Sequence, residues 1–342
     1  MGRIQEKSDN TYRMNKHMKF AVFGRGSIGT KHIHNLQSLG FVDIQAVSFR
    51  RDVRKDIHYK QTYGINTLHS IDELSDYNPD AFIIANPTSK HIETAKIAIG
   101  MESHIFMEKP LSHSLDGVDC LQDNILKKGL VFLQGNNLRF HPVLIMIKNI
   151  IENGDLGDIC FARVVAGQYL PDWHPLEDYR DSYSAIAALG GGVVLTLQHE
   201  IDYVYWFFGK IKVVKSIVKK VSNLEIDVED VAGILLETQR CPIVEVHLDY
   251  LQQPCKRYIQ VQGTMGSLEY SFGDDSLKLH DLQMDIYKEI LNVRNYDYNE
   301  TYLNELTHFI DCIDKGEKVA VNIYDAINVL KICLEIKRGF NN

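Results

Sequence analysis

The sequence predicts an α/β plus α+β fold: an N-terminal Rossmann domain with a doubly wound parallel sheet, followed by an open, mostly antiparallel β-sheet domain. Three observations predict it. The first half alternates apolar strand segments with helical periodicity, the middle is rich in strands, and the tail returns to helical periodicity. A chain of 342 residues is also long enough for two domains, because single cores rarely grow beyond about 250–300 residues.

The first half is built of repeated strand–helix units. We expect strands at 19–23, 44–49, 81–85, 105–107 and 131–134, and helices at 30–39, 71–74, 90–100 and 115–127. Between the strand that ends at 49 and the short helix that begins at 71, a polar stretch is expected. Strands that alternate with helices pair in parallel, because the crossover helix returns the chain to the same edge of the sheet.

The middle of the chain predicts an antiparallel sheet. Strands are expected at 159–167, 213–219, 231–237, 243–250, 258–262 and 267–270. Val244 and Val246 alternate with Glu245 and His247, as in a sheet with one packed and one solvated face. The expected division is an N-terminal extension (1–17), a dinucleotide-binding domain (18–138), a substrate and oligomerisation sheet (139–300) and C-terminal helices that pack back on the first domain (301–342).

Composition excludes several functional classes. The net charge of -8 gives no basic field for nucleic acid. The six cysteines are scattered without a CxxC pair, which favours reduced intracellular thiols and neither a disulfide framework nor a metal site. No apolar run reaches the length that spans a bilayer, and residues 1–17 lack the apolar core of a signal peptide. We therefore expect a cytoplasmic protein with no metal, no membrane partner and no nucleic-acid partner.

A glycine-rich turn follows the first strand. Gly24, Gly26 and Gly29, with Ser27 and Ile28 between them, form GxGxxG where a strand passes into a helix. In that context the first glycine makes the tight turn, the second lets a pyrophosphate approach the backbone, and the third lets helix and strand pack closely. The helix N-terminus then favours the negative charge. An ordinary strand-to-helix loop is the alternative.

The end of the second strand bears on the choice of nucleotide. An NAD enzyme places an acid there for the ribose hydroxyls, whereas this chain has Ser48, Arg50 and Arg51. A guanidinium pairs well with a 2′-phosphate, so NADP is preferred over NAD. The alternative is that both arginines are solvated loop charges beside Asp52 and Asp56.

Further motifs accompany the glycine turn. They are Asn86-Pro87-Thr88 with His91, Glu108-Lys109-Pro110, Asn137-Leu138-Arg139, and Gly190-Gly191-Gly192 with His199. With them the chain resembles the Gfo/Idh/MocA oxidoreductase family from about residue 19 to the C-terminus. The resemblance implies an active site between the two domains and a homodimer or homotetramer formed through the large sheet. It also implies cofactor contacts at Asn86, Pro87, Thr88, His91, Glu108, Lys109 and Asn137.

Lys109 is the first candidate catalytic residue, because it matches the lysine of the family's Glu-Lys-Pro signature. It follows an apolar strand at the carboxyl edge of the parallel sheet, where ligands bind in such folds. Its amine can hold the reacting hydroxyl and stabilise alkoxide character. The alternative is a surface lysine at a strand end.

His199 is the second candidate. The segment 193–203 predicts one helix, with Thr196, His199 and Tyr203 on one face. An imidazole that titrates near neutral pH suits a proton acceptor. The family implies an Asp four residues before this histidine, but here Thr196 stands three residues before it. The carboxylate's role is lost or moved to Glu200 or Asp202; alternatively, His199 is a packing residue capped by Asp202.

A segment rich in aromatic residues, 169–184, is expected to border the cleft and bind substrate. The substrate-binding candidates are Arg139, Tyr169, Trp173, Tyr179, Arg180 and Tyr183. Aromatic rings stack on sugar faces, and Arg180 can pair with a phosphate or carboxylate of a nucleotide sugar or sugar acid. A subunit contact is the alternative, because aromatic residues and arginine are also enriched at interfaces.

These residues predict an NAD(P)-dependent oxidoreductase that transfers hydride between the nicotinamide and a hydroxyl carbon of a sugar, sugar nucleotide or related polyol. Two alternatives remain. One is an enzyme of the same fold that cleaves glycosides with NAD as a recycled cofactor. The other is a non-catalytic NAD(P)-binding sensor or assembly subunit, which the missing Asp allows.

Overall fold

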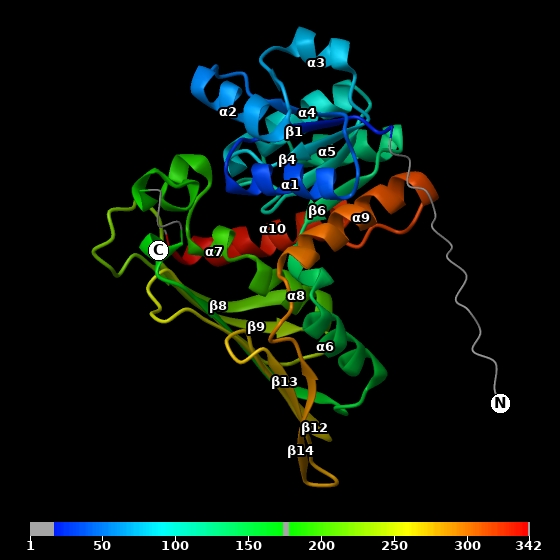
Figure 1. The fold of residues 1–342 in the computed structure, drawn as a ribbon. Helices are drawn as coiled ribbons and strands as arrows, with labels where there is room; N and C mark the ends of the chain where they lie inside the picture. The colour runs from blue at the N-terminus through cyan, green and yellow to red at the C-terminus, as the bar shows by residue number, and fades with distance from the viewer. Residues whose placement is uncertain (1–16, 174–177, 341–342) are drawn as a thin grey trace, which may run out of the picture.

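Two sheets organise the chain (Figure 1). The computed structural model describes residues 17–173 and 178–340. Six parallel strands form the first sheet in the order β3-β2-β1-β4-β5-β6, and eight strands form the second in the order β14-β13-β12-β11-β7-β10-β9-β8. The predicted fold class is confirmed. The expected N-terminal extension lies outside the described residues except for His17, and the domain division at 138 and 300 stays a prediction.

The first sheet carries its helices on both faces. Its elements are β1 (Phe20–Phe23), α1 (Ser27–Ser38), β2 (Ile44–Val47), α2 (Val53–Tyr63), β3 (Thr67–Leu68), α3 (Ile71–Tyr77), β4 (Ala81–Ile84), α4 (His91–Gly100), β5 (His104–Glu108), α5 (Val118–Lys128) and β6 (Phe132–Gly135). The strand order reverses between β1 and β4, so the ends of these strands form the switch point where such sheets bind ligands.

Helix α2 corrects the expectation of a polar stretch without a helix. Its only buried residue is Tyr59, so almost no apolar periodicity marks it. Its ends do carry signals. The Asp52 side chain accepts a hydrogen bond from Lys55 N at 3.1 Å, and Gly64 ends the helix in the left-handed conformation with φ 72°.

The second sheet is antiparallel except where β7 pairs with β10. Its strands are β7 (Ile159–Gly167), β8 (Ile211–Lys219), β9 (Val231–Thr238), β10 (Val244–Asp249), β11 (Lys256–Gly263), β12 (Gly266–Ser271), β13 (Ser276–Asp281) and β14 (Ile286–Asn292). Helices α6 (Pro142–Asn153), α7 (Val193–Thr196) and α8 (His199–Phe208) precede most of it in the chain. The strands β13 and β14 and helix α6 were not predicted, although Pro142 at the start of α6 and Gly154 after its end are helix-end signals.

One face of the second sheet is packed and the other is open. Val244, Val246 and Leu248 are buried, whereas Glu245 and His247 between them are exposed. This confirms the predicted alternation. Among the described residues, no helix is long and apolar enough to cross a membrane.

The chain ends in two helices, α9 (Asn299–Lys315) and α10 (Ile323–Lys337), and the segment around α10 contacts both sheets. Figure 1 shows α10 lying between them. Gln134 N, in the edge strand β6, donates to Val321 O at 3.0 Å. Ser216 on β8 donates from its hydroxyl to Ile336 O at 2.9 Å. The tail therefore contacts the second sheet as well as the first domain.

Candidate active site

The glycine turn between β1 and α1 has the close backbone packing that its sequence predicts. Gly24 has φ 104°, and a Cβ there would lie 2.2 Å from Ala85 O. A Cβ on Gly29 would lie 2.0 Å from Gly24 O. A Cβ on Gly26 would have no atom within 4 Å. Two glycines are thus required by packing, whereas the third borders open space at the helix N-terminus, which fits a bound pyrophosphate.

The loop after β2 holds Arg50 and Arg51 on the surface. Ser48 donates from its hydroxyl to Arg50 O at 2.8 Å. Asp52 caps α2, and Asp56 forms ion pairs with Arg25 and His69. Within the described residues, neither acid forms an ion pair with Arg50 or Arg51.

The His91 side chain holds the loop after β4 in place through contacts of its two ring nitrogens with backbone oxygens. This buried ring contacts Pro110 O at 2.8 Å and Asn86 O at 2.9 Å. Its side chain therefore lies behind the loop, so any contribution to cofactor binding would pass through Asn86 and Pro110. Thr88 begins the turn η1 (Thr88–Lys90), and its Cβ lies 2.9 Å from the position that a Cβ on Gly190 would take. The glycine cluster of the second domain thus packs directly on this loop.

Lys109 bridges the two domains. It follows the last residue of β5, and its Nζ donates a 2.8 Å hydrogen bond to the backbone oxygen of Thr196. The neighbouring Glu108 lies with Oε1 2.7 Å from Nε2 of the buried His32 on α1. The lysine amine is thus held at the boundary between the sheets, half-buried, as expected for a residue at the carboxyl edge.

The segment around Thr196 corrects the expected continuous helix. Helix α7 ends at Thr196, and α8 begins at His199 after a turn. The Thr196 hydroxyl accepts a 2.7 Å hydrogen bond from the buried Tyr250 hydroxyl. Thr196 and His199 therefore do not share one helical face, and Thr196 contacts Lys109 through its carbonyl.

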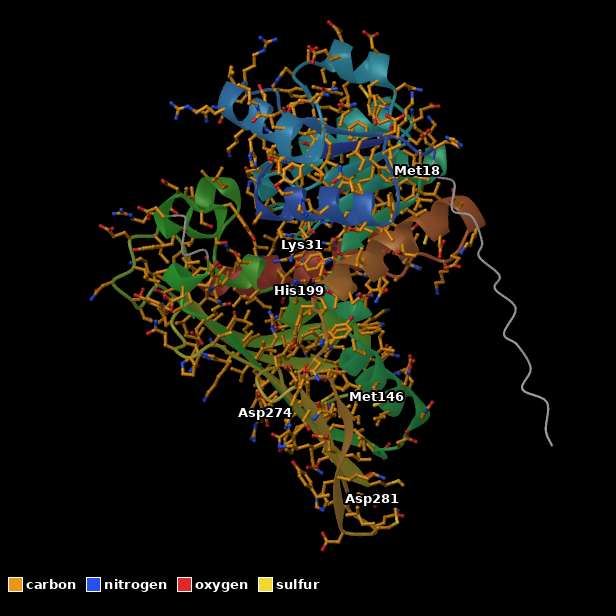
Figure 2. The ribbon with its side chains drawn as sticks, viewed as in Figure 1. Met18, Lys31, Met146, His199, Asp274 and Asp281 are labelled. Carbon is orange, nitrogen blue, oxygen red and sulfur yellow. The ribbon has the colours of Figure 1, made fainter. Side chains whose placement is uncertain are left out.

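His199 lies at the start of α8, between the domains (Figure 2). Burial and the positive charges of Lys109 and Arg257 lower its pKa well below the ordinary 6.5. It is therefore neutral at physiological pH, and within the described residues its Nδ1 has no hydrogen-bond partner. The unprotonated ring is available to accept a proton, while the neighbouring positive charges make it a weaker base than a free imidazole.

The residue after His199 in α8 is the carboxylate Glu200. It is fully buried, and its Oε1 lies 2.7 Å from Arg257 Nε. Burial raises its pKa, while the charges of Arg257 and Lys109 oppose the rise. Glu200, one of the two acids considered for the missing carboxylate's role, thus experiences the charge of Lys109.

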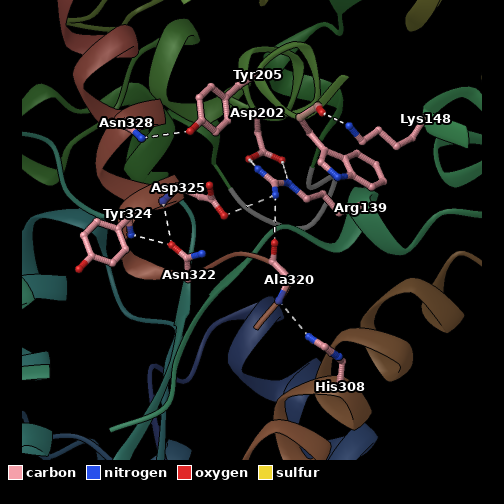
Figure 3. Close-up of polar contacts among 11 residues, drawn as sticks. Arg139, Lys148, Asp202, Tyr205, His308, Ala320, Asn322, Tyr324, Asp325 and Asn328 are labelled. Carbon is pink, nitrogen blue, oxygen red and sulfur yellow. Dashed lines mark hydrogen bonds and ion pairs between the residues drawn. The ribbon is translucent and has the colours of Figure 1, made fainter. Parts of the chain in front are cut away.

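Arg139 and Asp202 form a buried pair (Figure 3). Arg139 donates from Nε and Nη2 to the two Asp202 oxygens at 2.9 and 2.7 Å, and from Nη1 to Ala320 O at 3.1 Å. Because its donors are used inside the protein, Arg139 joins α8 to the C-terminal segment. The expectation that it binds substrate is corrected. Similarly, Asn137 donates from its amide to Thr301 on α9 at 2.8 Å.

The aromatic segment divides into two parts. Trp173 packs edge-on against Tyr250, with ring centroids 5.4 Å apart, directly behind Thr196. Arg180 instead pairs with Asp178 and Glu225 on the exposed side.

The other aromatic candidates also belong to this segment. The Tyr179 hydroxyl accepts from Glu225 N at 3.2 Å, and Tyr169 packs at the edge of the main core. Tyr183 lies near both Tyr250 and Tyr302, since it contributes to raising the pKa of each. Residues 174–177, part of the predicted substrate segment, lie outside the described residues.

Two residues of this region were missed from sequence. Arg257 on β11 contacts Glu200, and Tyr302 on α9 lies near Glu108 and Arg257. A signal existed for the arginine, because Arg257, Ile259 and Val261 alternate and the last two are buried. That register places a cation on the packed face of the strand.

Comparison with known proteins identifies the family to which this arrangement belongs. Residues 18–136 match the model of an oxidoreductase family with an NAD-binding Rossmann fold, and residues 144–269 match the GFO/IDH/MocA C-terminal domain. The chain belongs to the Gfo/Idh/MocA oxidoreductase family. It is therefore an enzyme of the oxidoreductase class whose first domain binds NAD in the manner of the Rossmann fold.

Individual family members are similar over nearly the full length. Myo-inositol 2-dehydrogenase from Thermotoga maritima is 27% identical over 338 residues, which cover 94% of this chain and 96% of that protein. Levoglucosan dehydrogenase in complex with NADH has a TM-score of 0.83 at 18% identity, covering 94% and 96% of the two chains. GenD2 from gentamicin A biosynthesis, in complex with NAD, has a TM-score of 0.82 at 20% identity, covering 100% and 98%.

Proposed function

We propose that this Gfo/Idh/MocA enzyme reversibly oxidises a hydroxyl group on a sugar, sugar nucleotide or related polyol. The placement of Lys109 and His199 at one boundary between the domains carries the proposal. The names of the similar dehydrogenases, which include myo-inositol 2-dehydrogenase, support this substrate class.

The proposed chemistry divides the work between two residues. Lys109 holds the reacting hydroxyl and stabilises negative charge on its oxygen. His199, which its lowered pKa keeps unprotonated, accepts the hydroxyl proton, and the hydroxyl held by Lys109 is made more acidic by that ammonium charge. When bound, a nicotinamide supplies the hydride acceptor. Glu200 and Arg257 fix the start of α8 from the second sheet.

Gly24, Gly26, Ser27, Ile28 and Gly29 would hold the pyrophosphate at the N-terminus of α1. The loop after β4 and Glu108 would line the nicotinamide end. We propose NADP as the preferred cofactor, because Arg50 and Arg51 are exposed and the nearby acids are engaged elsewhere. The bound NAD and NADH of similar structures favour NAD instead, so both cofactors belong in the test.

We further propose that copies of the chain pair through the open face of the second sheet. Ile217 and Leu235 are exposed there at 60% and 37%. A homodimer or homotetramer of the wild-type protein in light scattering would support this assembly, and a wild-type monomer would contradict it. The cytoplasmic location expected from the cysteine pattern stays a prediction.

The deciding experiment is a panel of sugars, sugar acids, sugar phosphates and polyols with NAD and NADP, followed at the absorbance of the reduced nicotinamide. Oxidation of one class supports the proposal. Cleavage of glycosides without net NADH release would identify the glycoside-cleaving alternative. Cofactor binding with no reaction across the panel would identify the non-catalytic alternative.

A further inference from the structure

Arg257 is a cation on the packed face of the second sheet. It is the second residue of β11, and its register partner on β7 is the buried Ala166. The next inward positions of β11, Ile259 and Val261, are apolar and buried. A guanidinium in this row needs partners, because burying an unpaired charge is costly.

Glu200 and Phe272 fix one side of this guanidinium. Arg257 Nε lies 2.7 Å from Glu200 Oε1, and the guanidinium lies 5.3 Å from the Phe272 ring centroid. Glu200 is fully buried, whereas 24% of the Arg257 side chain is exposed. Within the described residues, no hydrogen bond reaches the two terminal NH2 groups of Arg257. The arginine is thus anchored at Nε and open at its tip.

The guanidinium group of Arg257 lies beside the proposed reaction site. Arg257 and Lys109 both act on the pKa of His199, and Arg257 also acts on that of Tyr302 across the boundary. The Lys31 amine lies 4.4 Å from the centroid of the Tyr302 ring. Figure 2 shows Lys31 on the side of α1 that faces His199. Arg257 and Lys109 thus lie near His199, and Arg257 and Lys31 lie near Tyr302.

The carboxylates of Glu200, Glu108 and Glu305 also lie in this region and offset part of the positive charge, so recognition of an anion depends on the terminal donors of Arg257. Glu200 is engaged by Arg257, and Glu108 contacts His32. The two arginines expected from sequence to meet the substrate are occupied, since Arg180 pairs with Asp178 and Glu225 and Arg139 with Asp202. Of Arg139, Arg180 and Arg257, which all lie in described segments, Arg257 is the one with terminal donors available at this site.

We propose that Arg257 binds an anionic group, a carboxylate or a phosphate, on the sugar substrate and thereby selects acidic sugars over neutral ones. A guanidinium presents two parallel N–H donors that match the two oxygens of such a group. The neighbouring Lys31 and Lys109 add attraction without matching that geometry. This inference rests on the proposed oxidation of a sugar hydroxyl and assigns its substrate class.

The test compares matched sugars on the whole enzyme with both cofactors. Glucose is compared with glucuronate and glucose 6-phosphate, galactose with galacturonate, and myo-inositol with its 1-phosphate. We expect the kcat/KM of an acidic member to exceed that of its neutral partner at least tenfold. Preference for the uronates identifies a carboxylate, and preference for the phosphates identifies a phosphate.

Two variants at the arginine test its role. Arg257→Lys keeps the charge beside Glu200, and the double variant Arg257→Gln with Glu200→Gln removes both charges, so neither leaves a buried ion alone. We expect both to lose most of the acidic preference. Arg240→Lys, at an exposed arginine, is the matched control and should keep it.

The outcomes separate this inference from the proposed function. Equal or greater turnover of the neutral member in every pair, or a preference unchanged in both variants, overturns the role of Arg257 and leaves the oxidation standing. If no sugar is oxidised, the proposed function fails, and thermal shift then decides the inference alone. Stabilisation by glucuronate or glucose 6-phosphate that the variants lose supports it, and absence of stabilisation overturns it.

Discussion

The Lys109 amine and the Thr196 carbonyl oxygen lie 2.8 Å apart, so a side chain from the end of β5 is held by the backbone at the end of α7. Lys109 therefore links the two domains through this hydrogen bond. Its loss removes a charge from the proposed reaction site and a hydrogen bond between the domains.

Replacing Lys109 with Met is expected to lower kcat about 100- to 1,000-fold, because the charge that stabilises the developing alkoxide is lost. The dissociation constant of the cofactor should change little. Steady-state kinetics and cofactor titration measure the two quantities. Lys212→Met, at an exposed lysine on β8, is the control, and near-normal turnover in the Lys109 variant would sink the assignment.

The proton acceptor can be tested by pH. Because the pKa of His199 lies well below 6.5, the oxidation rate should stay on its plateau as the pH falls through 6.5. His199→Gln should lower kcat about 100- to 10,000-fold, whereas His58→Gln on the exposed face of α2 should not. A histidine titration by NMR in Lys109→Met should show the His199 pKa raised, since a positive charge is removed; an unchanged value would contradict the electrostatic account.

The glycine turn offers a matched pair of substitutions. Gly29→Ala places a Cβ 2.0 Å from Gly24 O, so the packing of α1 on β1 should be destabilised by about 1–3 kcal/mol or more. Gly26→Ala meets no atom within 4 Å, so the melting temperature should be retained while cofactor affinity falls at least tenfold. Loss of affinity with full stability in Gly26→Ala is the distinguishing result. Unchanged affinity would place the pyrophosphate elsewhere.

The cofactor preference depends on Arg50 and Arg51. The double variant to Ala should lower kcat/KM for NADP about 10- to 100-fold and leave that for NAD nearly unchanged. Arg54→Ala, an exposed arginine in α2, serves as control. Equal losses with both cofactors would show that these arginines do not recognise a 2′-phosphate.

Glu305 should make stability depend on pH. This buried residue of α9 has no hydrogen-bond partner for its carboxylate within the described residues, and burial together with the charge of Glu108 raises its pKa well above 4.5. A raised folded-state pKa means that its contribution is complete below about 4.5 and is lost as the pH rises through the folded value. Relative to Glu305→Gln, the wild type should therefore lose unfolding free energy as the pH increases from 4.5. Denaturant titrations at several pH values measure this, and parallel pH curves would disprove it.

The parts of the site that sequence predicted well are those defined by local backbone chemistry. The glycine turn and Lys109 after its strand need only a few neighbouring residues to be recognised, and the packing around Gly24 and Gly29 has the expected form. The expected role of Arg139 failed because its partner Asp202 is distant in sequence, and no local pattern shows that its donors are used. The break between Thr196 and His199 likewise depends on tertiary contacts, from Tyr250 and Lys109.

The position of α10 has a consequence for how the protein is made. The residues that bond to β6 and β8, Val321 and Ile336, come more than 100 residues after those strands in the chain. The hydrogen-bond network of Arg139 and Asp202 also includes the backbone oxygen of Ala320, which accepts from Arg139. Neither sheet can therefore reach its final form before residues 320–336 have been synthesised, so the two halves complete their folding together.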